Sequence, residues 1–350
     1  MYQRVLETLV HEIQAGKYRA GQRFPSEAAL VQQFRTSRIT VSRALAELAR
    51  RGMVERVAGS GTFVRAQPAA RATFGLLIPD LGQTEVFEPI CRGIACAPQA
   101  ADYALMWGQG SAALHLCDQF VERGVSGVFF APLEENENAK ATNLEIVARL
   151  ERARIPIVLL DRCFMRYPFR SRYDLAGIDN RRAGYLAADH LLRAGARRTA
   201  FVGRARSAAT VDARLAGYRE ALRAHSLPEQ PHLIFRPAAV NAAFVEEAHK
   251  KRQPDAYVCA NDRAAGELMR ALILAGYRVP GEVRIVGIDD VEYASLLPVP
   301  LTTVHQPCRE IGEAAMAAMI ERIARPGMLA RDILLECRLV VRESCGSGRR

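Results

Sequence analysis

Short apolar runs alternate with longer amphipathic segments over residues 74–290, and few folds accept such a pattern. A strand that is apolar along its whole length is buried on both faces, and amphipathic segments of about 10–15 residues form helices that cover a sheet. The alternation therefore predicts an α/β fold, with parallel sheet flanked by helices. The apolar runs occupy residues 74–79, 103–107, 127–132, 155–161, 175–179, 198–203, 232–235, 256–262 and 284–290.

These nine runs are more strands than one sheet usually contains, since sheets most often have about four to six strands. We therefore expect two similar α/β lobes, divided somewhere between Asp161 and Asp179. Each lobe would carry its own parallel sheet.

Polar residues stand where several of the runs end: Asp80, Asp161 and Arg162, Asn261 and Asp262, and Asp289 and Asp290. In open parallel sheets, ligands bind beyond the carboxyl ends of the strands, so we expect these side chains to line a crevice. Carboxylates, amides and arginines bind hydroxyl groups in fixed geometry, which predicts a site for a hydroxyl-rich ligand. The alternative for each residue is a helix cap or a turn.

The N-terminal residues follow a different pattern, centred on a short amphipathic helix over residues 36–52. Its apolar stripe consists of Val41, Ala44, Leu45 and Leu48, and Gly52 ends it. Ser37 stands at the N-cap, so Arg38, Thr40 and Arg43 point outward from the first turns. Hydroxyls and guanidinium groups in that position suit the major groove of DNA, whereas the alternative is a solvated helix with ordinary surface charge.

Two more helices and a hairpin surround this helix in the sequence. Val5, Leu6, Leu9 and Ile13 give a first stripe that ends at Gly16, a turn covers residues 18–23, and Ser26 can cap a second helix with Ala29, Leu30 and Phe34. After Gly52, two alternating segments flank a glycine-rich tip at residues 58–61, with Arg56 and Arg65 beside it. Three helices followed by a hairpin predict a winged helix-turn-helix.

The charge supports a polyanionic partner for this module. The chain carries a net charge of +10, and residues 1–70 hold 11 Lys and Arg against 5 Asp and Glu. Residues 71–350 are close to neutral for their length. A basic module on a nearly neutral body is typical of nucleic-acid binding.

Three motifs in order, GQRFPSEAAL at residues 21–30, TSRITVSRAL at 36–45 and GSGTFV at 59–64, resemble the DNA-binding domain of the gluconate-repressor (GntR) family of bacterial transcription regulators. The resemblance covers about the first 65 residues. Ala28 and Ser42 depart from the family pattern, which often has arginine there, and Arg43 is the compensating candidate. The resemblance implies DNA contacts at Ser37, Arg38, Thr40 and Gly61, to which we add Ser26 and Arg43 from the same motifs.

Residues 73–345 resemble the effector domain of the lactose-repressor (LacI) family, itself similar to periplasmic sugar-binding proteins. The motifs include IPIVLLDR at 155–162, ARLAGYREAL at 213–222, PDAYVCAND at 254–262 and LTTVHQP at 301–307. The resemblance implies three chain crossings between the lobes. It also implies effector contacts at Asp161, Arg214, Asn261 and Asp289, with Gln306 and Phe87 as neighbours. The winged helix replaces that family's own DNA headpiece, as in arabinose-responsive members of the gluconate-repressor family.

We therefore expect a winged helix-turn-helix at residues 1–66, a linker at 67–73 and a two-lobed effector domain at 74–345. The first lobe would hold about 74–175 and 304–330, and the second about 176–303 and 331–345. Arg214 has a competing interpretation as a surface arginine, whereas His190 and His305 are expected to be structural.

These features predict a ligand-controlled transcription regulator, a repressor of sugar uptake or catabolism genes that binds operator DNA as a homodimer. The strand-end groups favour a neutral sugar or polyol, and a purine effector stays open. A second hypothesis is an enzyme acting on a sugar or nucleotide with Asp161 and Asp289 as acid and base, but no phosphate-loop, dinucleotide or nucleophile-elbow motif occurs. A third is a sugar-binding module that binds no DNA.

Several classes are disfavoured by composition. The eight cysteines contain no C-x-x-C pair, and neither His190 nor His305 has a partner at metal spacing, so we expect no metal, cofactor or disulfide framework. No stretch of about 18 apolar residues and no basic-then-apolar leader occurs, so we expect a cytoplasmic protein with no membrane partner.

Overall fold

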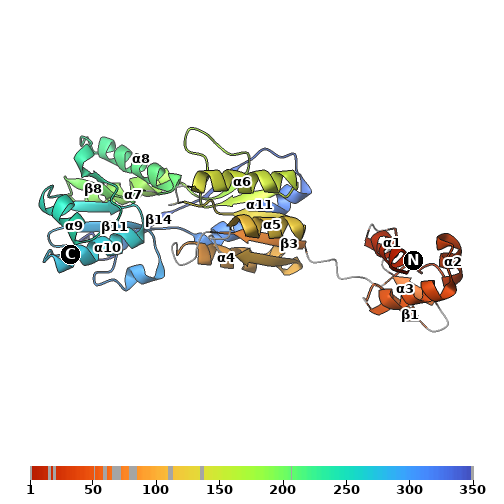
Figure 1. The fold of residues 1–350 in the computed structure, drawn as a ribbon. Coiled ribbons are helices and arrows are strands. Elements are labelled where there is room, and N and C mark those ends of the chain that lie inside the picture. The colour runs from red at the N-terminus through yellow and green to blue at the C-terminus, as the bar shows by residue number, and fades with distance from the viewer. Residues whose placement is uncertain are drawn as a thin grey trace. The chain divides into compact units, whose positions relative to one another are not determined.

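The computed structural model describes residues 2–14, 17–18, 21–50, 52–57, 61–64, 72–78, 85–108, 113–134, 138–205 and 207–347. The chain divides into two compact units, Met1–Ala72 and Thr73–Arg350, and each is described by itself (Figure 1). Several sequence features lie outside the described residues: Gly16, the hairpin tip at 58–60, Arg65, most of the expected linker, and Asp80.

The first unit is the predicted winged helix-turn-helix. It consists of helices α1 (Tyr2–Gln14), α2 (Glu27–Phe34) and α3 (Arg38–Arg50), and strands β1 (Val54–Val57) and β2 (Gly61–Val64). The two strands pair antiparallel, with Val54 opposite Val64. The predicted apolar stripes of the three helices pack into one core beside Phe24 and Met53.

Local signals set the helix ends in this unit. The Ser26 hydroxyl accepts a hydrogen bond from the Ala29 amide at 3.2 Å, and that of Ser37 accepts one from the Thr40 amide at 3.3 Å. Gly52 has a φ of 69°, the left-handed conformation that ends α3. The segment predicted as a turn also pairs with β2, because the Gly21 amide donates a backbone hydrogen bond to Val64 and the Gln22 carbonyl accepts one from it.

The second unit contains two six-stranded sheets, one in each lobe. The first lobe has the strand order β13-β7-β6-β5-β3-β4. Its helices α4 and α11 pack on one face of the sheet, and α5 and α6 pack on the other. Its elements are β3 (Ala72–Leu77), α4 (Phe87–Cys96), η1 (Pro98–Asp102), β4 (Tyr103–Gly108), α5 (Ala113–Glu122), β5 (Gly127–Phe130), α6 (Ala139–Arg152), β6 (Ile157–Leu160), β7 (Asp174–Ile178), α11 (Cys308–Ala324) and β13 (Asp332–Leu335).

The second lobe has the strand order β14-β12-β11-β10-β8-β9. Helices α7 and α8 cover one face, and α9 and α10 cover the other (Figure 1). Its elements are α7 (Asn180–Arg193), β8 (Thr199–Val202), α8 (Ala209–Ala224), η3 (Pro231–Leu233), β9 (Ile234–Phe235), α9 (Ala242–Val245), the π-helical turn η4 (Glu246–Lys250), β10 (Ala256–Cys259), α10 (Asp262–Leu274), β11 (Arg284–Asp289), η5 (Glu292–Ser295), β12 (Thr302–His305) and β14 (Arg338–Val340).

The chain passes between the lobes three times, after β7, after β12 and between β13 and β14. The expected lobe boundaries were wrong in detail. Residues 176–178 and 332–335 belong to the first sheet rather than the second lobe, and His305 ends a strand of the second sheet. The reason is that β7 and β13 pair with each other at the sheet edge, which only tertiary pairing reveals.

Each of the nine apolar runs forms a strand, β3 to β11, and the two-lobed α/β prediction is confirmed. The runs missed β12, β13 and β14. Strand β13 is exposed at alternate residues, and β14 is an antiparallel edge strand of three residues, so neither has the continuous apolar pattern of a central strand.

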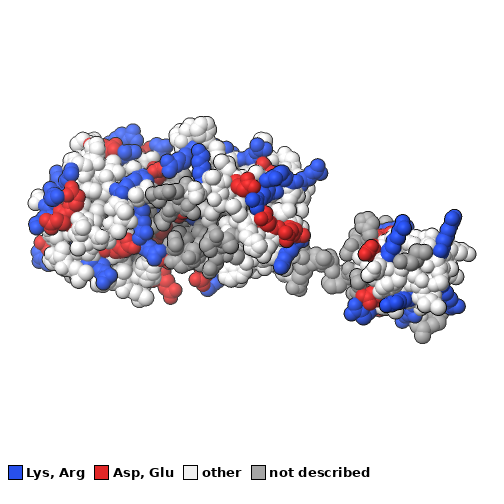
Figure 2. Space-filling model, viewed as in Figure 1, with Lys and Arg blue, Asp and Glu red and all other residues white. Residues whose placement is uncertain are grey.

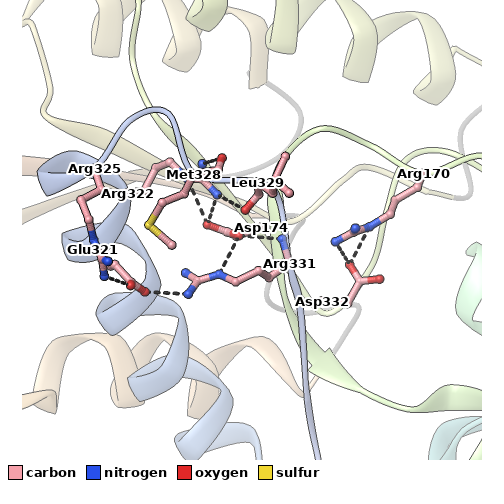
Figure 3. A network of polar contacts seen from close by, with 9 residues as sticks. All are labelled: Arg170, Asp174, Glu321, Arg322, Arg325, Met328, Leu329, Arg331 and Asp332. Atoms are coloured by element: carbon pink, nitrogen blue, oxygen red, sulfur yellow. Dashed lines mark hydrogen bonds and ion pairs between the residues drawn. The ribbon is translucent and has the colours of Figure 1, made fainter.

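A network around Asp174 anchors β13 to β7 (Figure 3). The Asp174 carboxylate is fully buried at the start of β7, where it accepts hydrogen bonds from Arg322 Nη2 at 2.8 Å and from the Arg331 amide at 2.8 Å. Arg331 Nη1 also pairs with Glu321 of α11 at 2.7 Å. The last crossing segment is therefore held to the first lobe by charge as well as by strand pairing.

Candidate functional site

A polar pocket lies between the lobes, and five of the six predicted effector residues line it. Asp161 follows β6 in the first lobe, whereas Asn261, Asp289 and Gln306 follow or end strands of the second sheet, and Arg214 comes from α8. The carboxyl ends of the two sheets thus supply the polar groups, as expected for open parallel sheets. Asp80, another of the strand-end residues, lies outside the described residues.

Arg214 connects three segments at the pocket wall, although it is 95% buried. Its Nε donates to the Asn180 side chain at 2.8 Å, and its Nη1 donates to the Ala260 carbonyl at 2.5 Å and reaches the Asp289 carboxylate at 3.3 Å. A buried, fully oriented guanidinium excludes the interpretation of Arg214 as a surface arginine. Such a group presents its donors to a ligand without first losing side-chain entropy.

The Asp289 carboxylate is the second fixed group of the pocket. It accepts a hydrogen bond from Gln306 Nε2 at 2.6 Å, and its backbone has a φ of 133°, which a side chain rarely adopts. Burial raises the pKa of Asp289, and the Arg214 guanidinium opposes that rise. Strain and burial at one carboxylate are typical of a functional position.

Asp161 and Arg162 form the first-lobe wall. Asp161 has a φ of 65°, and Arg162 donates from Nε to the Pro132 carbonyl at 2.9 Å and from Nη1 to Glu134 at 2.6 Å. The remaining Nη2 atom of Arg162 is buried and has no hydrogen-bond partner among the described residues. Sequence reasoning noticed Arg162 at the strand end but left it out of the predicted effector contacts.

Phe87 does not line the pocket. Its buried ring lies under the Arg162 guanidinium, with 5.1 Å between the guanidinium carbon and the ring centroid. Phe87, which was predicted to neighbour the effector, therefore supports Arg162 instead. The two residues are 75 positions apart in the sequence, and no local pattern reveals their contact.

The cap and turn alternatives explain some of the strand-end residues. Asn261 caps α10, since its side chain accepts a hydrogen bond from the Ala264 amide at 2.9 Å while it also lines the pocket. Asp262 accepts hydrogen bonds from Thr303 and Val291, and Asp290 pairs with His305 and Arg342. Asp262 and Asp290 are thus structural, and their neighbours Asn261 and Asp289 face the pocket.

The winged helix presents its predicted contact residues at the start of α3. Ser37 and Thr40 hydroxyls lie 2.9 Å apart, and the Arg38 side chain is 84% exposed with a contact to Glu27 at 3.3 Å. Arg43 instead lies over the Tyr2 ring of α1 at 4.7 Å. Basic side chains project from this unit (Figure 2).

Two further residues at this surface were missed. Ile39 is 81% exposed on the first turn of α3, and its signal in the sequence was an apolar residue off the buried stripe. Arg23 lies against Gly61, where an added Cβ would be 3.0 Å from Arg23 Nε, and Gly61 has a φ of 116° that favours glycine. Ser26 is exposed at the start of α2.

Neither a metal site nor a membrane segment is found among the described residues. No group of three or more His, Cys, Asp or Glu side chains there is arranged to hold a metal ion. In that same part of the chain, no helix is both long and apolar enough to span a bilayer. The eight cysteines are free thiols.

Comparisons with known families agree with this geometry. Residues 1–64 match the family described as bacterial regulatory proteins, gntR family, and residues 188–345 match the periplasmic binding protein-like domain. The chain therefore combines a GntR-type regulatory domain with a periplasmic-binding-protein-like domain that follows it.

Individual relatives share this organisation to different extents. The arabinose metabolism transcriptional repressor of Geobacillus stearothermophilus is 27% identical over 98% of this chain and 97% of its own length. The HTH-type transcriptional repressor PurR of Aliivibrio salmonicida is 28% identical over 60% of this chain and 61% of its own. The solved structure of the transcriptional regulator CelR–cellobiose complex shares the fold, with a TM-score of 0.68, 24% identity and coverage of 88% of this chain and 90% of that one.

Proposed function

We propose that this chain represses genes for the uptake or catabolism of a sugar and that an effector bound between its lobes controls its affinity for the operator. The observation that carries the proposal is the interlobe pocket, in which Arg214, Asp289 and Gln306 are already fixed by one another. Preorganised donors and acceptors of this kind suit hydroxyl groups. The similarity to an arabinose repressor along nearly the whole chain supports a sugar effector.

We infer that Asp161, Arg214, Asn261, Asp289 and Gln306 contact the effector and that Arg162, supported by Phe87, contacts it as well. A purine effector is the second candidate, favoured by the similarity to PurR. The described lining of the pocket contains no aromatic side chain on which a purine could stack. This composition favours the sugar.

On the DNA side, we propose that Ser26, Ser37, Arg38, Thr40, Arg43 and Gly61 contact the operator. One winged helix offers too few contacts for specific binding, so we propose a homodimer that spans two half-sites. Closure of the lobes around the effector would change the separation of the two reading helices and thereby the affinity for DNA.

We propose further that the protein is cytoplasmic, that residues 67–73 link its two units, and that it is not an enzyme. Asp289 is engaged by Arg214 and Gln306, which leaves it poorly placed to transfer a proton as the enzyme hypothesis requires. Incubation with a panel of sugars and sugar phosphates should give no turnover. Limited proteolysis should cut first between residues 65 and 73.

A pair of variants tests the proposed division of roles. Arg38→Ala should weaken operator binding in a mobility-shift assay and leave the effector-induced thermal shift intact, whereas Arg214→Ala should do the reverse. Arg193→Ala, in an exposed arginine of α7, is a control that should change neither. If both test variants stay folded and lose both activities, the roles are assigned wrongly.

A further inference from the structure

A second cavity adjoins the candidate effector pocket and shares Glu134, Arg162 and Ser207 with it. The start of α6 and the segment after β6 line one side of this cavity, and the segment before α8 lines the other. Both lobes therefore contribute to it. A molecule seated in the first pocket could extend into the second without leaving the interlobe space.

The two cavities differ in charge. The described lining of the first pocket holds four carboxylates, those of Glu85, Glu134, Asp161 and Asp289, against three guanidinium groups, those of Arg162, Arg204 and Arg214. Among the described residues, the second cavity is lined by the cations of Lys140, Arg162 and Arg166 and by one carboxylate, that of Glu134, which Arg162 engages at 2.6 Å. Lys140 and Arg166 have no ion pair with any described residue. The described lining of the second cavity is thus cationic, and we refer to it as the cationic cavity.

Two helices begin at the cationic cavity. Ala139 is the first residue of α6, which has 14 residues, and Ala209 is the first of α8, which has 16, and both line the cavity. Neither helix has a side-chain cap: Asn138 makes no capping hydrogen bond, and Ala208 has no polar side chain. The amide groups and positive dipole ends of both helices add to the attraction for an anion.

Arg162 gives an independent indication of a ligand. It is 95% buried, lines both cavities, and its Nη2 atom has no partner among the described residues. A buried guanidinium nitrogen without an acceptor is costly, so an acceptor supplied by a ligand would remove that cost. A carboxylate or phosphate oxygen is the strongest such acceptor.

We propose that the effector is an anionic sugar derivative, whose hydroxyl groups occupy the first pocket and whose phosphate or carboxylate group occupies the cationic cavity between Lys140, Arg166 and the starts of α6 and α8. This inference rests on the proposed function and replaces the neutral sugar of the sequence prediction with a charged one.

The test uses the full-length protein and matched pairs of ligands, measured by titration calorimetry and thermal shift. The pairs are ribose and ribose 5-phosphate, arabinose and arabinose 5-phosphate, glucose and glucose 6-phosphate, and glucose and gluconate. In at least one of these pairs, the anionic member should bind about tenfold or more tightly than the neutral member, because it gains charge-assisted hydrogen bonds. The phosphate and carboxylate arms distinguish the two possible anions.

Variants locate the anionic group. Lys140→Met and Arg166→Gln should each reduce the preference for the anionic member severalfold, and the double variant should abolish it while binding of the neutral member persists. Lys250→Met, which removes an exposed lysine of η4 paired with Glu246, is the charge-matched control and should leave the preference unchanged.

Three outcomes would contradict the inference. The inference is contradicted if both members of every pair bind equally, or if the preference for the anionic member survives in the double variant. In either case the proposed function still stands if the neutral sugar releases the protein from DNA. Absence of binding by every member of every pair overturns the proposed function together with the inference.

Discussion

At the scale of single residues, the pocket combines burial, fixed hydrogen bonds and unusual backbone conformation. Asp161 and Asp289 both adopt positive φ values, of 65° and 133°, directly at the carboxyl ends of strands. Such conformations cost about 1–3 kcal/mol each and persist only where the surroundings impose them. Here they turn carboxylates into the interlobe pocket instead of leaving them along the strand.

Ile39 carries a residue-scale prediction. An exposed apolar side chain on the first turn of a reading helix can contact the methyl group of thymine in the major groove. Ile39→Ser should therefore weaken specific operator binding about three- to tenfold without changing stability, because the side chain is exposed. Mobility-shift titrations measure this change.

A modified operator provides the control. Replacing the contacted thymine by uracil removes only the methyl group. This change should lower the operator affinity of the wild-type protein and leave that of the Ile39→Ser variant unchanged. Ile39→Leu should retain most of the affinity. Additive losses from the two changes would mean that Ile39 does not read that methyl group.

At the scale of elements, each lobe brings two helices together through glycines. In the first lobe, a Cβ added at Gly93 of α4 would lie 2.0 Å from the Arg309 carbonyl oxygen of α11. In the second, a Cβ added at Gly184 of α7 would lie 1.9 Å from the Arg214 carbonyl oxygen of α8. The close crossing of α7 and α8 thus fixes the backbone of the arginine that lines the pocket.

This crossing predicts different effects for two matched substitutions. Gly184→Ala and Gly93→Ala should each destabilise the protein by about 1–3 kcal/mol through overpacking. Only Gly184→Ala should also weaken effector binding, because it displaces Arg214. Thermal denaturation with and without the effector separates the two effects, and equal losses of effector affinity would contradict the proposed link.

Asp174 carries a second prediction for the elements. Asp174→Ala should destabilise the second unit by about 3–5 kcal/mol, because it leaves the Arg322 guanidinium buried without its partner. The double variant Asp174→Leu with Arg322→Met should recover part of that loss in chemical denaturation. A single variant as stable as the wild type would show that β13 is anchored by strand pairing alone.

At the scale of the whole molecule, the proposed function links operator binding by the first unit to effector binding by the second, and this linkage is reciprocal. If the effector changes the operator affinity by a given factor, the operator changes the effector affinity by the same factor. The two measurements come from different assays, mobility shift and calorimetry. Their agreement therefore tests the coupling without any assumption about its structural route.

Salt dependence separates the two kinds of binding in the same molecule. Operator affinity should fall by about 10³-fold or more between 50 and 200 mM salt if six or more phosphates are contacted. Effector affinity should change far less, because a single small effector contacts far fewer charged groups than operator DNA does. A flat salt response of operator binding would contradict a phosphate-contacting winged helix.

Much of the fold follows from local patterns in the sequence. The nine apolar runs mark the buried strands because a strand covered on both faces must be apolar throughout. Ser26, Ser37 and Gly52 mark helix ends because caps act over a few residues. The strand-end polar residues predicted four of the residues that line the pocket, since parallel strands bring their carboxyl ends to one edge.

The rest was decided by contacts between distant segments. Strand β13 is specified by its pairing with β7 and by the contacts of Asp174. The role of Phe87 depends on the guanidinium group of Arg162. The cationic cavity depends on two helices that begin about 70 residues apart. Periodicity and capping record only how a residue relates to its near neighbours along the chain. Which distant segments contact one another depends on packing, which brings together groups whose spacing in the sequence carries no signal.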